Sequence, residues 1–379
     1  MAYTPPANHE YRVFLCSIPD VVLTSVNENI QVDVYPDTLY VTPVFTATYA
    51  PDLNATVRFN IADIFRSYMH TDLPSTDIYL QQHVYMGFGF KVTGLDSGTV
   101  WMNYYNVLLS RFEADDNPWT YLETHYNTLQ PREKSVTKES PEHLTIHNIG
   151  PVSPRQLYAR FYPKTGGSTD VALTRPTYTG MNTYRFNWDT LWKLRPGNCY
   201  QYVDIVVIDN GDDQMTQRYI YSRQTGKEHY FLWVNALGGI DTVTFQGANI
   251  MQPKITHNIG RNNGLPVQLD DSDDYVEWRQ LSGWFPWRQR EWLCDFISSK
   301  LGHWIYDQDN DTCAKIVVTS SEMEASDDGQ LFQFSFTYRL VKKANTMGAA
   351  SQESTFSQAV TWAAEKIDYD DTQVVEKEE

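Results

Sequence analysis

The chain has 379 residues, enough for two or three domains that each bury a hydrophobic core. Its formal net charge of −17 argues against direct binding to nucleic acid, which requires Lys and Arg to neutralise phosphates, and against anionic membrane surfaces. Aromatic residues make up 14% of the chain, and this share, with 25 Tyr and 11 Trp, favours β-strands.

The four cysteines are scattered along the chain as Cys16, Cys199, Cys294 and Cys313. None forms a CxxC pair and no Cys/His spacing matches a zinc site, so we expect reduced, mostly buried thiols and neither metal nor other cofactor. The first residues lack the basic and apolar regions of a signal peptide, and no apolar run approaches the roughly 20 residues of a membrane helix. We therefore expect a protein made in soluble form inside the cell.

The first part of the chain alternates short apolar and polar runs separated by turn residues. This pattern predicts strands at residues 11–17, 30–34, 39–49, 57–61, 79–92, 100–109 and 119–126. A short helix is predicted from the spacing of Ile61, Ile64, Phe65, Tyr68 and Met69. Residues 130–142 are polar and predict a linker or a long exposed loop.

A similar order then recurs. Strands are predicted at residues 156–162, 184–186, 200–208 and 218–223, with a short helix at 189–193 that Pro196 and Gly197 end. Residues 229–235 and 242–246 flank Gly238 and Gly239, and glycines adopt positive φ at no steric cost, so this stretch predicts a hairpin.

The third part differs in pattern. Pro286 can begin a helix in which Trp292, Phe296 and Ile297 face the core. Strands are predicted at residues 275–281, 304–306, 314–319 and 331–341. Residues 358–367 predict an amphipathic helix, followed by an acidic end. Such an arm is either mobile in a free subunit or ordered only against a neighbour.

Two short sequences recur in the same order along the chain. Arg58-Phe59-Asn60 is repeated at Arg185-Phe186-Asn187, and His-Asn-Ile-Gly occurs at 147–150 and again at 257–260. Together with the shared order of strands, they predict a duplicated module. We therefore predict a mainly β protein with two related β-sandwich modules, each with a short helix, at 1–150 and 151–260, followed by an α+β domain at 261–343 and a C-terminal arm at 344–379.

Candidate catalytic and metal-binding patterns are weak. Asp307, Asp309 and Asp311 match the start of a calcium loop, but Thr312 and Val318 stand where Gly and Glu are required, so a polar turn is favoured. The acidic run at 270–274 is interpreted as a solvated loop. His147 and His257 have no second His or Cys at ligand spacing and are interpreted as structural. Since the sequence contains no nucleophile, metalloprotease or phosphate-binding motif, we predict that the protein is not an enzyme.

The aromatic residues are the strongest indication of binding, because exposed Trp and Tyr serve both protein interfaces and sugar platforms. Most of these side chains are expected in the core, where β-sandwiches use many aromatics. The predicted interface or ligand contacts are Trp233, Trp284, Trp287 and Trp362.

The last two-thirds of the chain resembles virion structural proteins of tailed phages that infect gut-type bacteria. The resemblance lies in the aromatic strand that leads into Trp233-Val234-Asn235-Ala236-Leu237-Gly238-Gly239-Ile240-Asp241-Thr242, the Trp292-Leu293 helix, and the closing strand Phe334-Ser335-Phe336-Thr337-Tyr338. It implies a homo-oligomeric, ring-forming subunit of the tail, baseplate or neck-collar, assembled in the host cytoplasm and located in the virion, with other virion proteins as partners. It implies no catalytic residue.

Two alternatives remain from the residues themselves. A carbohydrate-binding adhesin would present Trp and Tyr platforms to a host glycan. A polysaccharide hydrolase would use paired carboxylates contributed by distant strands, and no pair stands out in the sequence.

Overall fold

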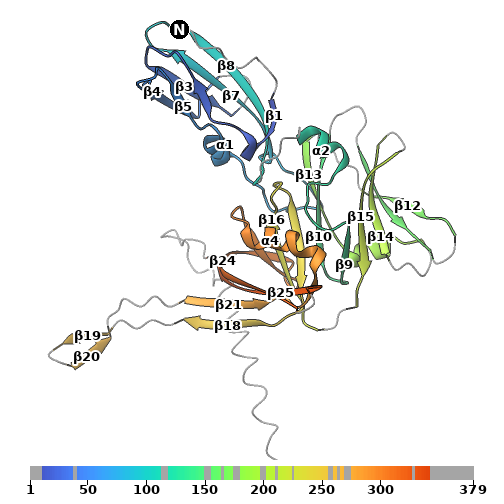
Figure 1. Cartoon of the computed structure of the whole chain (residues 1–379). Helices are drawn as coiled ribbons and strands as arrows, with labels where there is room; N and C mark the ends of the chain where they lie inside the picture. Colours follow the sequence, from blue (N-terminus) through green and yellow to red (C-terminus); the bar gives the residue numbers. More distant parts are fainter. Residues whose placement is uncertain are drawn as a thin grey trace, which may run out of the picture. The chain divides into compact units, whose positions relative to one another are not determined.

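The computed structural model describes residues 11–36, 41–111, 118–148, 155–163, 166–173, 180–196, 202–209, 212–223, 226–254, 259–262, 265–268, 275–326 and 329–341. Within these residues the chain is mainly β, as predicted, and its strands form several sheets (Figure 1). The described residues up to Leu340 belong to one compact unit. Among the described helices none is long and apolar enough to cross a membrane. The predicted helix at 358–367, Trp362, His257, Cys199 and the acidic run at 270–274 lie outside the described residues.

The first sandwich contains a five-stranded sheet with the order β1-β8-β7-β3-β4. These strands are Tyr11–Phe14, Val100–Leu108, Tyr85–Gly94, Ile30–Tyr35 and Phe45–Tyr49. The smaller sheet pairs β2 (Val21–Leu23) with β5 (Val57–Phe59). A 3-10 turn, η1 (Leu15–Ser17), follows β1, and helix α1 (Ala62–Tyr68) follows β5. Phe65 of α1 stacks on Phe88 at 4.3 Å between ring centroids, so the helix closes the core.

The second sandwich repeats this arrangement. Its five-stranded sheet has the order β9-β15-β14-β11-β12, formed by Glu133–Val136, Asp212–Tyr221, Tyr202–Asp209, Gln156–Phe161 and Thr169–Ala172. The opposite sheet contains β10 (Pro141–Asn148), β13 (Gly180–Asn187) and the added strand β6 (Ile78–Leu80). Helix α3 (Trp188–Lys193) follows β13.

The strand pairing confirms that the two modules are related. In each five-stranded sheet the first strand of the module runs parallel to the last, and the remaining neighbours are antiparallel. In each module a short helix directly follows a strand of the smaller sheet: α1 follows β5, and α3 follows β13. The last hairpin of each module, β7–β8 or β14–β15, comes after this helix. In the first sandwich, β8, β7, β3 and β4 correspond to strands G, F, C and C′ of immunoglobulin-type sandwiches, and β2 and β5 correspond to strands B and E. In the second sandwich, β15, β14, β11 and β12 correspond to G, F, C and C′, and β10 and β13 correspond to B and E.

The repeated Arg-Phe-Asn sequence has a physical reason. The side chain of Asn60 accepts a hydrogen bond from the backbone N–H of Asp63 (3.1 Å), and Asn187 accepts one from Thr190 (2.8 Å). Each Asn therefore satisfies a backbone donor in the first turn of the following helix, which is a common role of Asn at helix starts. Arg-Phe-Asn thus occupies equivalent places in the two modules.

The repeated His-Asn-Ile-Gly sequence does not mark equivalent positions. Its first copy begins on β10 with His147, whereas the second runs into β19 (Ile259–Asn262), which pairs with β20 (Leu265–Gln268). Since β9 and β10 pair with strands of the second sandwich, the boundary predicted at 150 falls inside that sandwich, and residues 130–142 are not a linker. The hairpin at 229–246 likewise pairs with the third sheet rather than closing the second module at 260.

The strand predicted at 119–126 is wrong, because helix α2 (Pro118–Thr124) occupies most of this range. A proline at the first helical position loses no hydrogen bond there and has a φ suited to the helix. The aromatic residues that suggested a strand are thus compatible with one short helix, in which Leu122 is buried in the first core.

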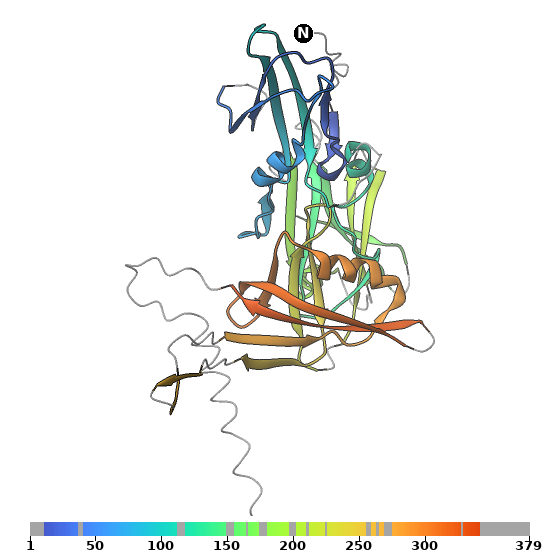
Figure 2. The same cartoon turned by 60° about the vertical axis from the view of Figure 1, so that its left-hand side comes forward.

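The third sheet follows the order β17-β16-β23-β24-β25-β21-β18, with β22 beside β25. These strands are Ile240–Phe245, His229–Val234, His303–Asp307, Thr312–Ala325, Leu331–Leu340, Tyr275–Leu281, Asn249–Lys254 and Phe285–Pro286. A 3-10 turn, η2 (Trp287–Gln289), leads into helix α4 (Arg290–Ser298), drawn in orange in Figure 2. Trp292 and Phe296 of α4 pack with Phe231, Phe245 and Phe336 of the sheet, which confirms the predicted α+β arrangement.

Candidate functional site

The turn between β16 and β17, residues 235–239, is called here the junction loop because it contacts both sandwiches. On the side of the first sandwich, the backbone N–H of Arg111, just after β8, donates to the carbonyl of Ala236 (2.8 Å). The hydroxyl of Thr71, which follows α1, donates to the carbonyl of Gly238 (2.7 Å). Gly238 has a φ of 78°, a conformation that glycine adopts without steric cost.

The junction loop makes a second set of contacts with the chain that enters the second sandwich. The side-chain amide of Asn127 donates to the carbonyl of Leu237 (2.8 Å), and that of Asn235 donates to the carbonyl of Asn127 (2.9 Å). A Cβ atom added at Gly239 would lie 2.1 Å from the carbonyl oxygen of Asn127, so only glycine fits there. The loop therefore joins all three modules through buried hydrogen bonds.

Two buried carboxylates support the junction loop. Asp295 of α4 forms an ion pair with Arg111 and accepts hydrogen bonds from the indole N–H of Trp233 (2.9 Å) and the backbone of Ala236 (3.2 Å). Asp241 accepts from the indole N–H of Trp292 (2.9 Å) and the amide of Asn235 (3.0 Å).

Burial raises the pKa of both carboxyls, that of Asp241 to about 6. Shifts of this kind often accompany catalysis. Here, however, Asp241 is 0% exposed and Asp295 is buried, and the oxygens of both serve hydrogen bonds between elements. The geometry therefore assigns them to the connection between modules.

A buried ion pair connects the second sandwich to the third sheet. Lys134 of β9 pairs with Glu142 of β10 and also donates to the carbonyl of Thr242 on β17 (2.6 Å). Ser140 donates to the other oxygen of Glu142 (2.9 Å). A buried charge without its partner would be costly, so this pair fixes the two strands relative to β17.

Stability is expected to fall on acidification from neutral pH. Burial lowers the pKa of His143 to about 3 and those of His147 and His229 to about 4. Because the unfolded chain takes up these protons near pH 6.5, their contribution is present above about pH 6.5 and is lost as pH falls toward about 4. Asp241, whose raised pKa has the opposite effect, offsets part of this loss.

The measurement is the urea midpoint of unfolding at about pH 7.5 and about pH 5. The midpoint should be lower at the acid pH, and His147→Gln should reduce the difference. His125→Gln, which alters an exposed histidine, serves as the control and should leave the difference unchanged. An equal or higher midpoint at the acid pH would mean that the buried histidines do not lower stability on acidification.

The exposed aromatic side chains predicted as contacts gather beside β22. Trp284 is 54% exposed, Trp287 is 44% exposed, and Leu331 lies opposite Pro286 in the strand pairing and is also exposed. We call these three residues the Trp patch. Trp287 packs edge-on against Phe332, with 6.1 Å between ring centroids, so its ring is anchored on one side and open on the other.

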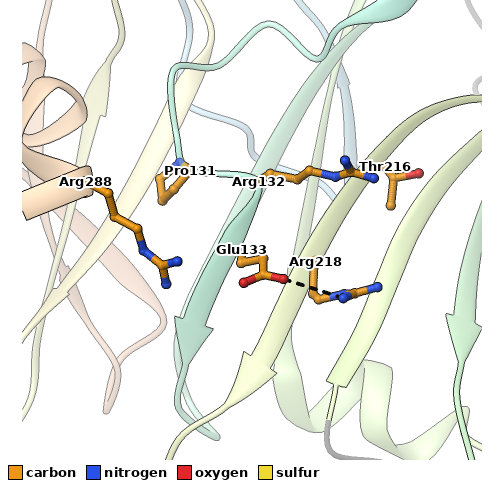
Figure 3. A pocket seen from close by; sticks show the side chains of 6 residues that line it. All are labelled: Pro131, Arg132, Glu133, Thr216, Arg218 and Arg288. Carbon is orange, nitrogen blue, oxygen red and sulfur yellow. Dashed lines mark hydrogen bonds and ion pairs between the residues drawn. The ribbon is translucent and has the colours of Figure 1, made fainter. Parts of the chain in front are cut away.

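A pocket of about 450 Å³ is lined by Pro131, Arg132, Glu133, Thr216, Arg218 and Arg288 (Figure 3). Arg218 is fixed by two hydrogen bonds to Asp204 (2.8 and 2.9 Å). Arg132 and Arg288 are exposed, and neither pairs with a carboxylate within the described residues. Arg288 follows Trp287 in η2, so the pocket and the Trp patch share one element. In an acidic chain, this is a local concentration of positive charge.

The prediction that Trp233 is an interface or ligand contact is wrong, because its side chain is 0% exposed and packs against Trp292 and Phe296. It cannot be a surface contact in this fold. Its indole reaches Asp295 instead, which makes Trp233 part of the support of the junction loop.

The other sequence candidates are structural where they are described. His147 is buried on β10, with its ring edge-on to Tyr85 at 5.4 Å. Asp307 accepts a hydrogen bond from the backbone of Asp309 (3.0 Å), and Asp311 pairs with Arg185, so these carboxylates stabilise a polar turn, as predicted.

Sequence reasoning missed Arg111, Asn235, Asp241 and Asp295 as a connected set. One signal was available, since Asp295 lies within the helical pattern that also contains Trp292 and Phe296. A carboxylate among apolar helix positions indicates a buried partner. Which partner it has depends on a contact with Arg111, 184 residues away.

No protein-family model matches the chain, and no curated protein matches it significantly. Among solved structures, the chain is similar to the crystal structure of the N-terminal eight immunoglobulin domains of Down Syndrome Cell Adhesion Molecule, isoform 1.30.30. The identity is 9% and the TM-score 0.17, and the match covers 90% of this chain and 46% of that one. Such a score carries no argument about fold or function, so the relation to immunoglobulin-type sandwiches rests on strand order alone.

Proposed function

We propose that this protein is a structural subunit of a tailed-phage virion, which forms an oligomeric ring in the tail, baseplate or neck and contacts other virion proteins. The observation that carries the proposal is the junction loop, through which buried polar groups connect three modules. Modules fixed in this way suit a subunit that must hold several binding surfaces at set spacings. The phage context rests on the resemblance of the Trp233–Thr242 and Phe334–Tyr338 sequences.

The Trp patch is the surface we assign to partner contact. Interfaces concentrate binding energy in a few Trp, Tyr and Arg side chains, and this patch lies beside Arg288 and Arg290. The guanidinium of Arg290 lies 5.0 Å from the centre of the Trp287 ring and helps to fix its orientation. An ordered aromatic anchor loses little side-chain freedom on binding, which favours affinity.

The double variant Trp284→Ala/Trp287→Ala is expected to weaken assembly by about 2 kcal/mol or more, roughly thirtyfold, while leaving the fold intact. The full chain would be examined by light scattering and electron microscopy for rings, and by pull-down with virion proteins encoded by neighbouring genes. Leu53→Ala is the matched control, because Leu53 is a fully exposed apolar residue of the first sandwich. A wild-type chain that stays monomeric and binds none of these proteins would contradict the proposal.

A second candidate function is glycan binding, which the exposure of Trp284 and Trp287 favours, since sugar rings stack on such platforms. A glycan array and saccharide quenching of Trp fluorescence separate the two candidates. Quenching that the double variant abolishes, in a chain without ring formation, would favour the adhesin. Ring formation without any glycan signal would favour the virion subunit.

A further inference from the structure

The segment 69–84 connects the first sandwich to the second. It leaves α1, adds β6 to the smaller sheet of the second sandwich, and turns at 82–84 into β7 of the first. Three potential metal ligands lie on it: His70 and Asp72 at its beginning and His83 in its closing turn. His70 and His83 are far apart in the sequence, and they meet because the chain turns back toward the first sandwich after β6.

The three side chains approach one another closely. One ligand atom from each lies within 4.8 Å of the other two. The nitrogen Nε2 of His70 is 3.6 Å from Oδ1 of Asp72, and the rings of His70 and His83 are 4.1 Å apart. The Nδ1 atom of His83 is buried and has no hydrogen-bond partner. In the tautomer that leaves a lone pair on Nδ1, a metal ion would supply the partner that this nitrogen lacks.

The backbone of Asp72 is held by Gln81, and its carboxylate contacts Tyr79. Gln81 accepts from the backbone N–H of Asp72 (3.0 Å) and donates to its carbonyl (2.8 Å), and the same amide donates to Thr183 (3.1 Å). The hydroxyl of Tyr79 donates to Oδ2 of Asp72 (3.5 Å) and leaves Oδ1 on the side of His70. Outer partners of this kind orient metal ligands.

We propose that His70, Asp72 and His83 bind a divalent transition-metal ion of the Zn²⁺ class. Two imidazole nitrogens and one carboxylate oxygen form a ligand set that favours such ions over Ca²⁺ or Mg²⁺. Water would occupy the remaining coordination positions. His70 is exposed and can rotate to bring its nitrogen into the bonding distance of about 2 Å.

The bound ion would close segment 69–84 into a loop and stabilise the connection between the two sandwiches. Thr71, which lies between two of the ligands, also donates to the junction loop at Gly238. An ion that binds only the folded chain raises its stability, and the gain grows with the logarithm of the ion concentration once that concentration exceeds the Kd. This role is independent of the proposed assembly function, and its test requires no partner protein.

The test uses the full chain, stripped of metal by a chelator and kept reduced, and titrates it calorimetrically with Zn²⁺. We expect one ion per chain, a rise in the unfolding midpoint with Zn²⁺, and visible d–d absorption when Co²⁺ replaces it. His83→Gln and Asp72→Asn should each weaken binding at least about tenfold. His125→Gln alters an exposed histidine outside the cluster and should bind as the wild type does.

Unfolding midpoints of the metal-free variants establish whether each variant folds. Folded variants that lose Zn²⁺ binding support the site. The proposal is overturned if the wild-type chain binds no Zn²⁺, or if one ion per chain still binds with unchanged affinity in both His83→Gln and Asp72→Asn.

Discussion

Gly239→Ala is expected to destabilise the protein by about 3 kcal/mol, at the upper end of the cost of forcing an extra methyl into a packed interior. The new Cβ would lie 2.1 Å from the carbonyl oxygen of Asn127 and 3.0 Å from the side-chain nitrogen of Asn235. The first of these atoms belongs to the backbone and cannot rotate away. Relief requires the junction loop to move, which breaks the hydrogen bonds of Asn127 with Asn235 and Leu237.

The measurement is urea unfolding of the full chain, followed by Trp fluorescence and by calorimetry. Separation of one calorimetric transition into two would show that the modules have lost their connection. Gly226→Ala is the matched control, since a Cβ at Gly226 meets no atom within 4 Å. If the two variants unfold at the same urea concentration, the close packing of Gly239 against Asn127 does not stabilise the connection between the modules.

Local sequence was sufficient for most elements of the two sandwiches. Asn60 and Asn187 each accept a hydrogen bond from a backbone N–H three residues along the chain, so their effect is visible as a short repeat. The alternation of Phe332, Phe334, Phe336 and Tyr338 likewise predicted a strand with one buried face, which β25 has. These features depend on neighbours along the chain.

The module boundaries and the junction could not be predicted in this way. The contact between Asn127 and Leu237 spans 110 residues, and the pairing of β9 with β15 spans more than 80. Neither an Asn at 127 nor a Leu at 237 indicates from the sequence which distant residue it contacts. The identity of His-Asn-Ile-Gly in two places predicts a module boundary, yet one copy begins on β10 within the second sandwich.

The buried position of Trp233 illustrates the same limit. Its strand, β16, lies between β17 and β23, and α4 covers the face on which Trp233 lies. Alternation along β16 shows which residues share a face, but whether that face is covered depends on a helix nearly 60 residues later. Trp284 and Trp287, by contrast, remain 54% and 44% exposed.

Asp295→Ala is expected to cost about 3–5 kcal/mol, because it leaves the charge of Arg111 largely buried without its partner. It also removes the acceptor of Trp233 and Ala236. The free energy of unfolding would be measured in urea for Asp295→Ala, for Arg111→Met and for the double variant. Since the double variant carries no unpaired charge, it should be more stable than the sum of the single losses predicts.

The conservative variant Asp295→Asn tests the charge separately, because its amide keeps one oxygen as an acceptor for Trp233 and Ala236. We expect a loss smaller than that of Asp295→Ala and, because Arg111 again lacks a counter-charge, a similar gain when Arg111→Met is added. Asp63→Ala is the control, since the ion pair of Asp63 with Arg66 is exposed and should contribute less than about 1 kcal/mol. Additive losses for Arg111 and Asp295 would mean that the two side chains act independently, and the ion pair would then not be what connects the end of β8 to α4.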